Sequence, residues 1–138
     1  MSKINELKVG DEIPALKKYV EKYQPIIYAG ASGDFNPIHI DPEFGKAVGL
    51  GGNILQGLCT MAFVAQANTN WLGDPSLLKK LKVRFASPVK PDDTIVVKGK
   101  IAKKEGEKII IELWAENQKG ELVITNAFSE ITIMAHGS

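Results

Sequence analysis

The chain has 138 residues, the length of one domain, and a domain of this size buries roughly two thirds of the surface that its unfolded chain exposes. Its 17 Lys and Arg residues nearly balance 16 Asp and Glu, and a formal net charge of +1 argues against a nucleic-acid-binding protein. No apolar run approaches the roughly 20 residues that a membrane span requires. We therefore expect a single domain, residues 1–138, with neither nucleic acid nor a membrane as its partner.

The N-terminal third of the chain predicts short elements. Residues 11–20 favour an extended segment. Gln24–Ala31 favours a short helix, because Pro25 would lie in its first turn, where proline is tolerated. Pro42–Val48 predicts one further helical turn.

Between these helical segments lies Tyr28–Asp41, with the sequence YAGASGDFNPIHID. Pro37 has no amide hydrogen and disfavours the α conformation at the residue before it, so we expect Asp34 and His39 to lie on a turn or loop. Histidine has the side-chain pKa closest to neutrality, and a nearby carboxylate can orient it for proton transfer. Short polar residues beside glycine and proline also form ordinary turns. Catalysis is favoured because the second histidine, His136, lies in the C-terminal tail.

The middle of the chain predicts one long helix. The glycines at 49–52 match no phosphate-binding pattern and indicate a flexible loop. Asn53–Asn70 is apolar on nearly every side, which predicts a helix buried all round, with Asn53 as its N-cap and Gly73 among its stop signals. Gly57 would lie near the first turn, where a free backbone N–H can bind an oxyanion. Close packing against another element explains this glycine equally well.

The C-terminal half changes to a period of two, which is typical of strands. Leu81–Phe85 and Ile109–Leu113 follow this alternation, and Thr94–Lys103 and Leu122–Met134 are rich in β-branched residues. About five antiparallel strands and one apolar helix predict an α+β domain in which the sheet wraps around a central helix, the hot-dog arrangement. Because the edges of such a sheet need cover, we expect a dimer.

The single cysteine, Cys59, lies within an apolar run and is expected to be a buried thiol, not a nucleophile. A lone cysteine forms no internal disulfide, which fits a reducing compartment. The N-terminal segment is charged and has no apolar core of the kind that signal peptides carry. These features predict a cytoplasmic protein, and the sequence offers no cluster of metal ligands.

Several separated motifs together resemble one known family. Ser32–Asp41, reading SGDFNPIHID, is similar to the signature of the MaoC-like, R-specific enoyl-CoA hydratase and (3R)-hydroxyacyl dehydratase family. Ile54–Thr60 resembles the start of that family's central helix, and Val83–Val89 resembles the strand after it. The resemblance covers almost the whole chain in order, and it implies a hot-dog fold.

The resemblance also implies roles for individual residues. Asp34 and His39 match the catalytic pair, which holds and activates one water molecule, and Gly57 matches the residue whose backbone amide binds the thioester carbonyl. Asn36 matches a motif residue that holds the loop or the water, although an ordinary turn contact accounts for it as well. Ser32 has the same two interpretations, a contact within the site or a turn cap.

One position departs from the family pattern. Gln56 stands where the family usually has a histidine before Gly57. Glutamine donates and accepts hydrogen bonds but does not titrate, so a structural hydrogen bond survives this replacement and a proton-linked role does not.

The implied reaction is the interconversion of trans-2-enoyl-CoA and (3R)-3-hydroxyacyl-CoA by addition or loss of water, with no cofactor besides the CoA or acyl carrier protein (ACP) of the thioester. Lys80, Lys82 and Arg84 form a basic cluster that suits either carrier, although alternating charges on a solvated strand face give the same pattern. Three alternatives remain: an ACP-dependent dehydratase, a non-catalytic acyl-thioester-binding subunit, and a thioesterase. The exposed sheet edge accepts an identical or a related chain, so we expect a homodimer, with a heterodimer as the alternative. The preferred acyl chain length and the physiological direction of the reaction stay open.

Overall fold

The computed structural model describes residues 6–133, so His136 and the predicted end of the last strand at Met134 lie outside the described residues. The N-terminal part forms β1 (Leu16–Tyr19), α2 (Gln24–Ser32), α3 (Pro37–Ile40) and α4 (Pro42–Ala47). The long helix α5 (Gly57–Leu72) and a 3₁₀ turn, η1 (Pro75–Leu77), follow. The chain then forms β2 (Leu78–Phe85), β3 (Thr94–Glu105), β4 (Lys108–Glu116) and β5 (Leu122–Thr132).

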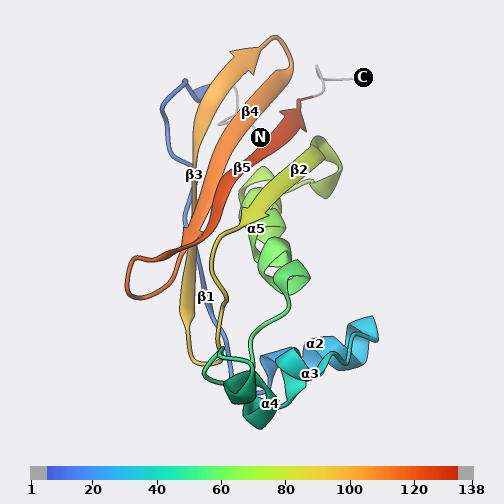
Figure 1. The fold of residues 1–138 in the computed structure, drawn as a ribbon. Helices are drawn as coiled ribbons and strands as arrows, with labels where there is room; N and C mark the ends of the chain where they lie inside the picture. Colours follow the sequence, from blue (N-terminus) through green and yellow to red (C-terminus); the bar gives the residue numbers. More distant parts are fainter. Residues whose placement is uncertain (1–5, 134–138) are drawn as a thin grey trace.

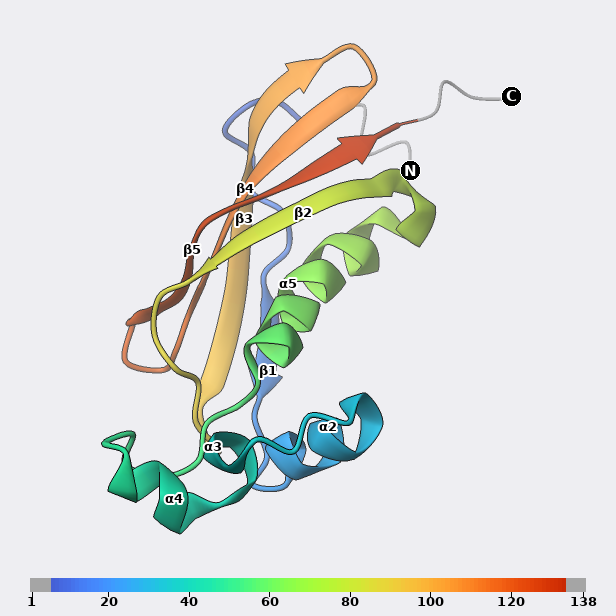
Figure 2. The ribbon, with the colours of Figure 1, turned by 45° about the vertical axis from the view of Figure 1, so that its right-hand side comes forward.

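The strands form one five-stranded antiparallel sheet in the order β1-β3-β4-β5-β2. Figures 1 and 2 show that the sheet curls and that α5 runs along its concave face, while α2, α3 and α4 gather beyond the N-terminal end of α5. The α+β hot-dog prediction is therefore confirmed. β1 and β2 are the edges of the sheet within the part of the chain that the structure describes.

The core lies between the sheet and α5 because alternate strand residues point toward the helix. On β4 the inward residues Ile109, Ile111, Leu113 and Ala115 are at most 1% exposed, whereas Glu112 between them is exposed. They meet the buried α5 residues Phe63, Val64 and Ala67 in one cluster. This burial of apolar surface fixes the position of α5, because each buried CH₂ contributes about 0.8 kcal/mol.

Two expectations about the long helix are wrong. The helix begins at Gly57 with Gln56 at the N-cap, not at Asn53, because the preceding residues run extended and bond to neighbouring segments instead. The helix is also not buried all round: Leu58 is 65% exposed and Ala62 is exposed, since the sheet covers only one face of α5. The predicted stop at Gly73 is confirmed, as it has φ 74° and its N–H bonds to Thr69.

No helix within residues 6–133 is long and apolar enough to cross a membrane.

Candidate active site

Asp34 and His39 face each other where α2 ends and α3 begins. Gly33 ends α2 in the left-handed conformation, with φ 80°, and Asp34 follows in the loop. His39 lies in the short helix α3 and not in a loop as expected, because Asn36 caps a single turn that starts at Pro37. His39 Nε2 and Asp34 Oδ2 are 3.8 Å apart, with the histidine side chain 11% exposed and the aspartate side chain 52% exposed. The structure therefore brings the two predicted residues together.

Three hydrogen bonds between residues close in sequence shape the loop, and one of them orients the Asp34 carboxylate. Ser32 Oγ accepts from the Asp34 amide at 3.1 Å, Asp34 Oδ1 accepts from the Asn36 amide at 3.2 Å, and Asn36 Oδ1 accepts from the Ile38 amide at 3.2 Å. These are turn and cap contacts, which was one of the two interpretations of Ser32 and Asn36. Because Oδ1 is held by the backbone, Oδ2 is the oxygen directed toward His39.

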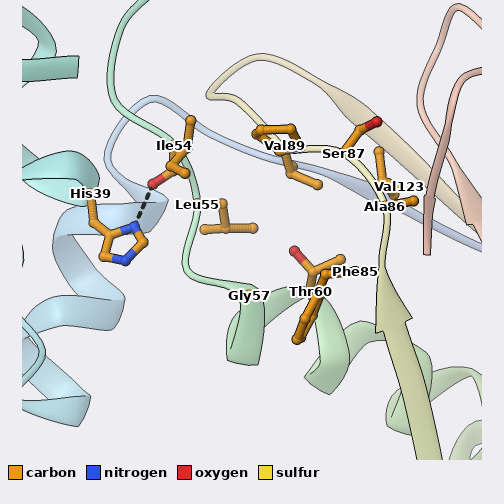
Figure 3. A pocket seen from close by; sticks show the side chains of 11 residues that line it. His39, Ile54, Leu55, Gly57, Thr60, Phe85, Ala86, Ser87, Val89 and Val123 are labelled. Carbon is orange, nitrogen blue, oxygen red and sulfur yellow. Dashed lines mark hydrogen bonds between the residues drawn. The ribbon is translucent and has the colours of Figure 1, made fainter. Parts of the chain in front are cut away.

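The tautomer of His39 follows from its second contact. His39 Nδ1 lies 2.9 Å from the Ile54 carbonyl oxygen (Figure 3). A carbonyl only accepts hydrogen bonds, so Nδ1 carries the proton and Nε2 of the neutral ring presents a lone pair. Nε2 and Asp34 Oδ2 are then two acceptors that face each other, and a molecule that donates two hydrogen bonds, such as water, satisfies both.

The segment before α5 holds α3 in place. Ile54 N–H donates to the Ile38 carbonyl at 2.8 Å, and Asn53 Nδ2 donates to the His39 carbonyl at 2.9 Å. Together with the Nδ1 bond, these contacts fix both the backbone and the ring of His39. The sequence does not reveal this role of Asn53 and Ile54, because Asn53 acts through a contact distant in sequence and Ile54 through a backbone carbonyl that no side-chain pattern indicates.

Gly57 is the first residue of α5, so its N–H has no intrahelical partner, and it lines the same pocket as His39. Gln56, at the N-cap, is 2% exposed and donates from Nε2 to the Pro25 carbonyl at 2.8 Å. This bond ties the start of α5 to α2, which is the structural hydrogen bond that a glutamine can provide at this position. Gln56 is not among the residues that line the pocket.

The pocket has a volume of about 310 Å³ and lies between α3, the start of α5, the end of β2 and the segment after it (Figure 3). Its walls are mainly apolar, as is usual for small-molecule sites. The lining residues are His39, Ile54, Leu55, Gly57, Thr60, Phe85, Ala86, Ser87, Pro88, Val89 and Val123.

The predicted basic cluster lies on β2 but outside the pocket. Lys80, Lys82 and Arg84 are exposed on the edge strand β2, and they alternate with Leu81 and Val83, which are partly buried against the core. Alternation places the three cations on the opposite face of the strand, and none of them lines the pocket of the single chain.

Cys59 is buried, and this burial raises the pKa of its thiol above the ordinary value, as expected for a structural cysteine. Within residues 6–133, no group of three or more His, Cys, Asp or Glu side chains could hold a metal ion.

Gly45 positions the loop that leads to α5. A Cβ at this position would overlap with the Gly52 carbonyl oxygen, so only glycine allows α4 and the loop to approach this closely. Gly49 and Gly51 have φ of 88° and 80°, a region that other residues rarely adopt. The glycines therefore meet conformational requirements just before Asn53 and Ile54, and they do not line the pocket that contains His39.

Comparison with known proteins identifies the class to which this fold and site belong. The model of the MaoC like domain family matches residues 6–120. One chain of the ChsH1–ChsH2 complex from Mycobacterium tuberculosis superposes with a TM-score of 0.81 at 26% identity, covering 92% of this chain and 98% of that one. The chain belongs to the MaoC-like domain family.

Curated relatives are considerably longer than this chain. Peroxisomal multifunctional enzyme type 2 from Mus musculus is 39% identical over 102 residues, covering 72% of this chain and 13% of the relative. The peroxisomal enoyl-CoA hydratase 2 of Arabidopsis thaliana is 40% identical over 95 residues, covering 67% and 26%. The chain thus corresponds to one part of each of these relatives.

The close approach at Gly45 predicts that Gly45→Ala lowers the free energy of unfolding by about 1–3 kcal/mol, because the added methyl group must displace the Gly52 backbone. Gly30→Ala is the matched control: Gly30 lies inside α2 with open space around it, so this change should stabilise by about 0.5–1 kcal/mol. Urea denaturation of both variants gives the comparison. Equal stability of the two variants would contradict the positioning role of Gly45.

Proposed function

We propose that this chain is an R-specific hydratase that interconverts trans-2-enoyl-CoA and (3R)-3-hydroxyacyl-CoA. The observation that carries the proposal is the facing pair His39 Nε2 and Asp34 Oδ2, 3.8 Å apart, beside a pocket that also contains Gly57. Membership of the MaoC-like family and similarity to a relative named enoyl-CoA hydratase 2 support it.

The reaction uses the pair to activate water. One water molecule donates to both Nε2 and Oδ2, and its oxygen attacks C3 of the enoyl thioester while the pair takes one of its protons. The electrons of the C2–C3 double bond move to the thioester carbonyl oxygen, forming an enolate, and C2 then accepts the proton that the pair had taken, which restores the carbonyl and the pair. Each turnover thus adds the elements of one water, and the reverse sequence is dehydration.

Gly57 stabilises the enolate. Its N–H lies at the N-terminus of α5, where aligned peptide dipoles favour negative charge. A donor that is already oriented meets the developing oxyanion without reorganisation. Loss of one such donor typically raises the activation barrier by roughly 3–4 kcal/mol. The start of α5 is held by Gln56, whose bond to the Pro25 carbonyl keeps Gly57 in place.

The direct test follows the absorbance of the conjugated enoyl thioester of crotonyl-CoA with purified protein, with chiral analysis of the product. Formation of (3R)-3-hydroxybutyryl-CoA supports the proposal. Formation of the 3S product contradicts the stereochemistry, and release of free CoA without hydration indicates a thioesterase.

Asp34→Asn and His39→Gln should each lower turnover roughly 100- to 10,000-fold, because each removes proton-transfer ability at nearly constant volume. Asp11→Asn is the matched control, since Asp11 is an exposed turn residue whose carboxylate accepts from the Lys8 amide. Circular dichroism should show the same fold in all three variants. Near-normal hydration by a well-folded Asp34 or His39 variant would exclude the pair as the catalytic residues.

The carrier of the acyl group is proposed to contact Lys80, Lys82 and Arg84, whose positive charge suits the phosphates of CoA or an acidic ACP. Lys80→Glu/Lys82→Glu should raise KM for crotonyl-CoA about tenfold or more with little change in kcat. Lys8→Glu/Lys17→Glu changes the net charge by the same amount at exposed positions on other segments and serves as the control. Equal KM values in both double variants would contradict the proposed contact between the basic cluster and the carrier.

We also propose that the chain forms a homodimer. Ile26, Ile27 and Leu58 are 46%, 63% and 65% exposed, and they lie on α2 and the first turn of α5, near the site. Large apolar side chains gathered on a surface often mark an interface. Light scattering of the purified chain should give twice its mass of 15.0 kDa. A monomer that becomes active only with a second, related chain would instead indicate a heterodimer.

A further inference from the structure

Thr60 places a hydroxyl in a part of the pocket that is otherwise apolar. It is 3% exposed, and it lines the pocket together with His39 and Gly57. Ser87 also lines the pocket, but it lies across the pocket from His39 and its oxygen points away from that ring (Figure 3). Valine has nearly the shape of threonine, and burying a hydroxyl without a partner costs free energy. Packing alone therefore does not explain a threonine at this position.

The helix leaves this hydroxyl without its usual partner. A helical threonine often bonds to the carbonyl four residues earlier, which here belongs to Gln56. That carbonyl already accepts from the Cys59 and Thr60 amides, at 3.0 and 3.3 Å. On the same helix, Thr69 Oγ1 does bond back, to the Gln66 carbonyl at 3.5 Å, whereas the described part of the chain gives the Thr60 hydroxyl no such bond. The hydroxyl can therefore donate to a molecule in the pocket.

Thr60 follows Gly57 by one turn on the same face of α5. Residues three apart on a helix are neighbours, with about 5–6 Å between their Cβ positions. Helical side chains lean toward the N-terminus, so the Thr60 side chain leans over the turn that begins with Gly57. Figure 3 shows its oxygen directed into the pocket, toward Leu55 and Val89. One ligand oxygen about 3 Å from both donors can thus accept from the Gly57 N–H and the Thr60 hydroxyl together.

Apolar groups surround these two donors. A Cβ at Gly57 would lie 3.1 Å from Phe85 Cζ, so the ring of Phe85, the last residue of β2, lies against the first turn of α5. Leu55 and Val89 are both 3% exposed and belong to the core cluster. A hydrogen bond to a charged oxygen is electrostatically stronger in such low-dielectric surroundings than in water.

We infer that Thr60 is a second donor to the thioester carbonyl oxygen, so that its hydroxyl and the Gly57 N–H together form the oxyanion site. The inference rests on the proposed function and adds a catalytic residue to that same site. When water adds to C3, the carbonyl oxygen takes the charge of the enolate, and its hydrogen bond from Thr60 shortens while the hydroxyl keeps its proton. When C2 accepts its proton, the carbonyl forms again and this bond weakens.

Thr60→Val removes the hydroxyl with little change in volume. It should lower kcat for hydration of crotonyl-CoA about 100-fold or more with a smaller change in KM, because the bond is strongest in the transition state. Thr60→Ser keeps a hydroxyl and should retain most of the activity. Thr69→Val is the matched control, since Thr69 lies on the same helix but does not line the pocket. Circular dichroism checks the fold, and Thr60→Ala gives the same comparison if the valine variant does not fold.

Infrared difference spectroscopy gives a second readout that needs no turnover. The probe is butyryl-CoA with an isotopic label at the thioester carbonyl carbon; it has no double bond to hydrate, and its C=O stretch reports the hydrogen bonds to that oxygen. Binding to the natural chain, Thr60→Ser and Thr69→Val should move the stretch to lower wavenumber. The shift should be smaller in Thr60→Val. A loss of rate without any change in the stretch would indicate a structural role for Thr60 and overturn the inference.

The two measurements separate this inference from the proposed function. A carbonyl shift that Thr60→Val reduces, without hydration by any form, supports the contact of Thr60 with the carbonyl and contradicts the hydratase. Hydration that Thr60→Val leaves at the natural rate supports the hydratase and contradicts the role of Thr60. Absence of thioester binding by any form contradicts both.

Discussion

The hydrogen bond from His39 Nδ1 to the Ile54 carbonyl is the contact on which the site depends. It assigns the ring proton to Nδ1 and turns Nε2 toward Asp34. The bond also joins two parts of the chain, because Ile54 is three residues before Gly57. The proposed proton acceptor and the proposed oxyanion donor are thus held by one short segment, so a shift of that segment disturbs both groups together.

Packing on either side keeps this segment in place. The sheet positions α5 through its buried face, and Gln56 ties the first turn of the helix to α2. On the other side, the contact between Gly45 and Gly52 sets the path of the loop that leads to Asn53. The glutamine that departs from the family pattern is buried and donates to a backbone carbonyl, while its Oε1 has no hydrogen-bond partner within the described residues.

The edge strand β2 contributes to the proposed function from both faces. Its outward face carries the cations proposed to contact the carrier, and Phe85 at its end borders the pocket.

The sequence by itself determined most of the strands, the end of the central helix and the pairing of Asp34 with His39. Alternation predicts β4 and β5 because one face of each strand is buried, and Gly73 ends α5 because few other residues adopt its conformation. Each of these features depends on a few neighbouring residues, so it can be predicted from a short stretch of the chain. The motif also paired Asp34 with His39, and the fold places them together.

Only the tertiary structure decided where α5 begins and what surrounds the pair. Asn53 looks like an N-cap in the sequence, but its side chain bonds to the His39 carbonyl, 14 residues away, and such a partner is visible only after folding. One face of α5 is exposed although its composition is apolar, because the sheet of a single chain covers only the other face. The contact of Phe85 with Gly57 likewise joins the end of an edge strand to the start of a helix, and no local pattern encodes that distance.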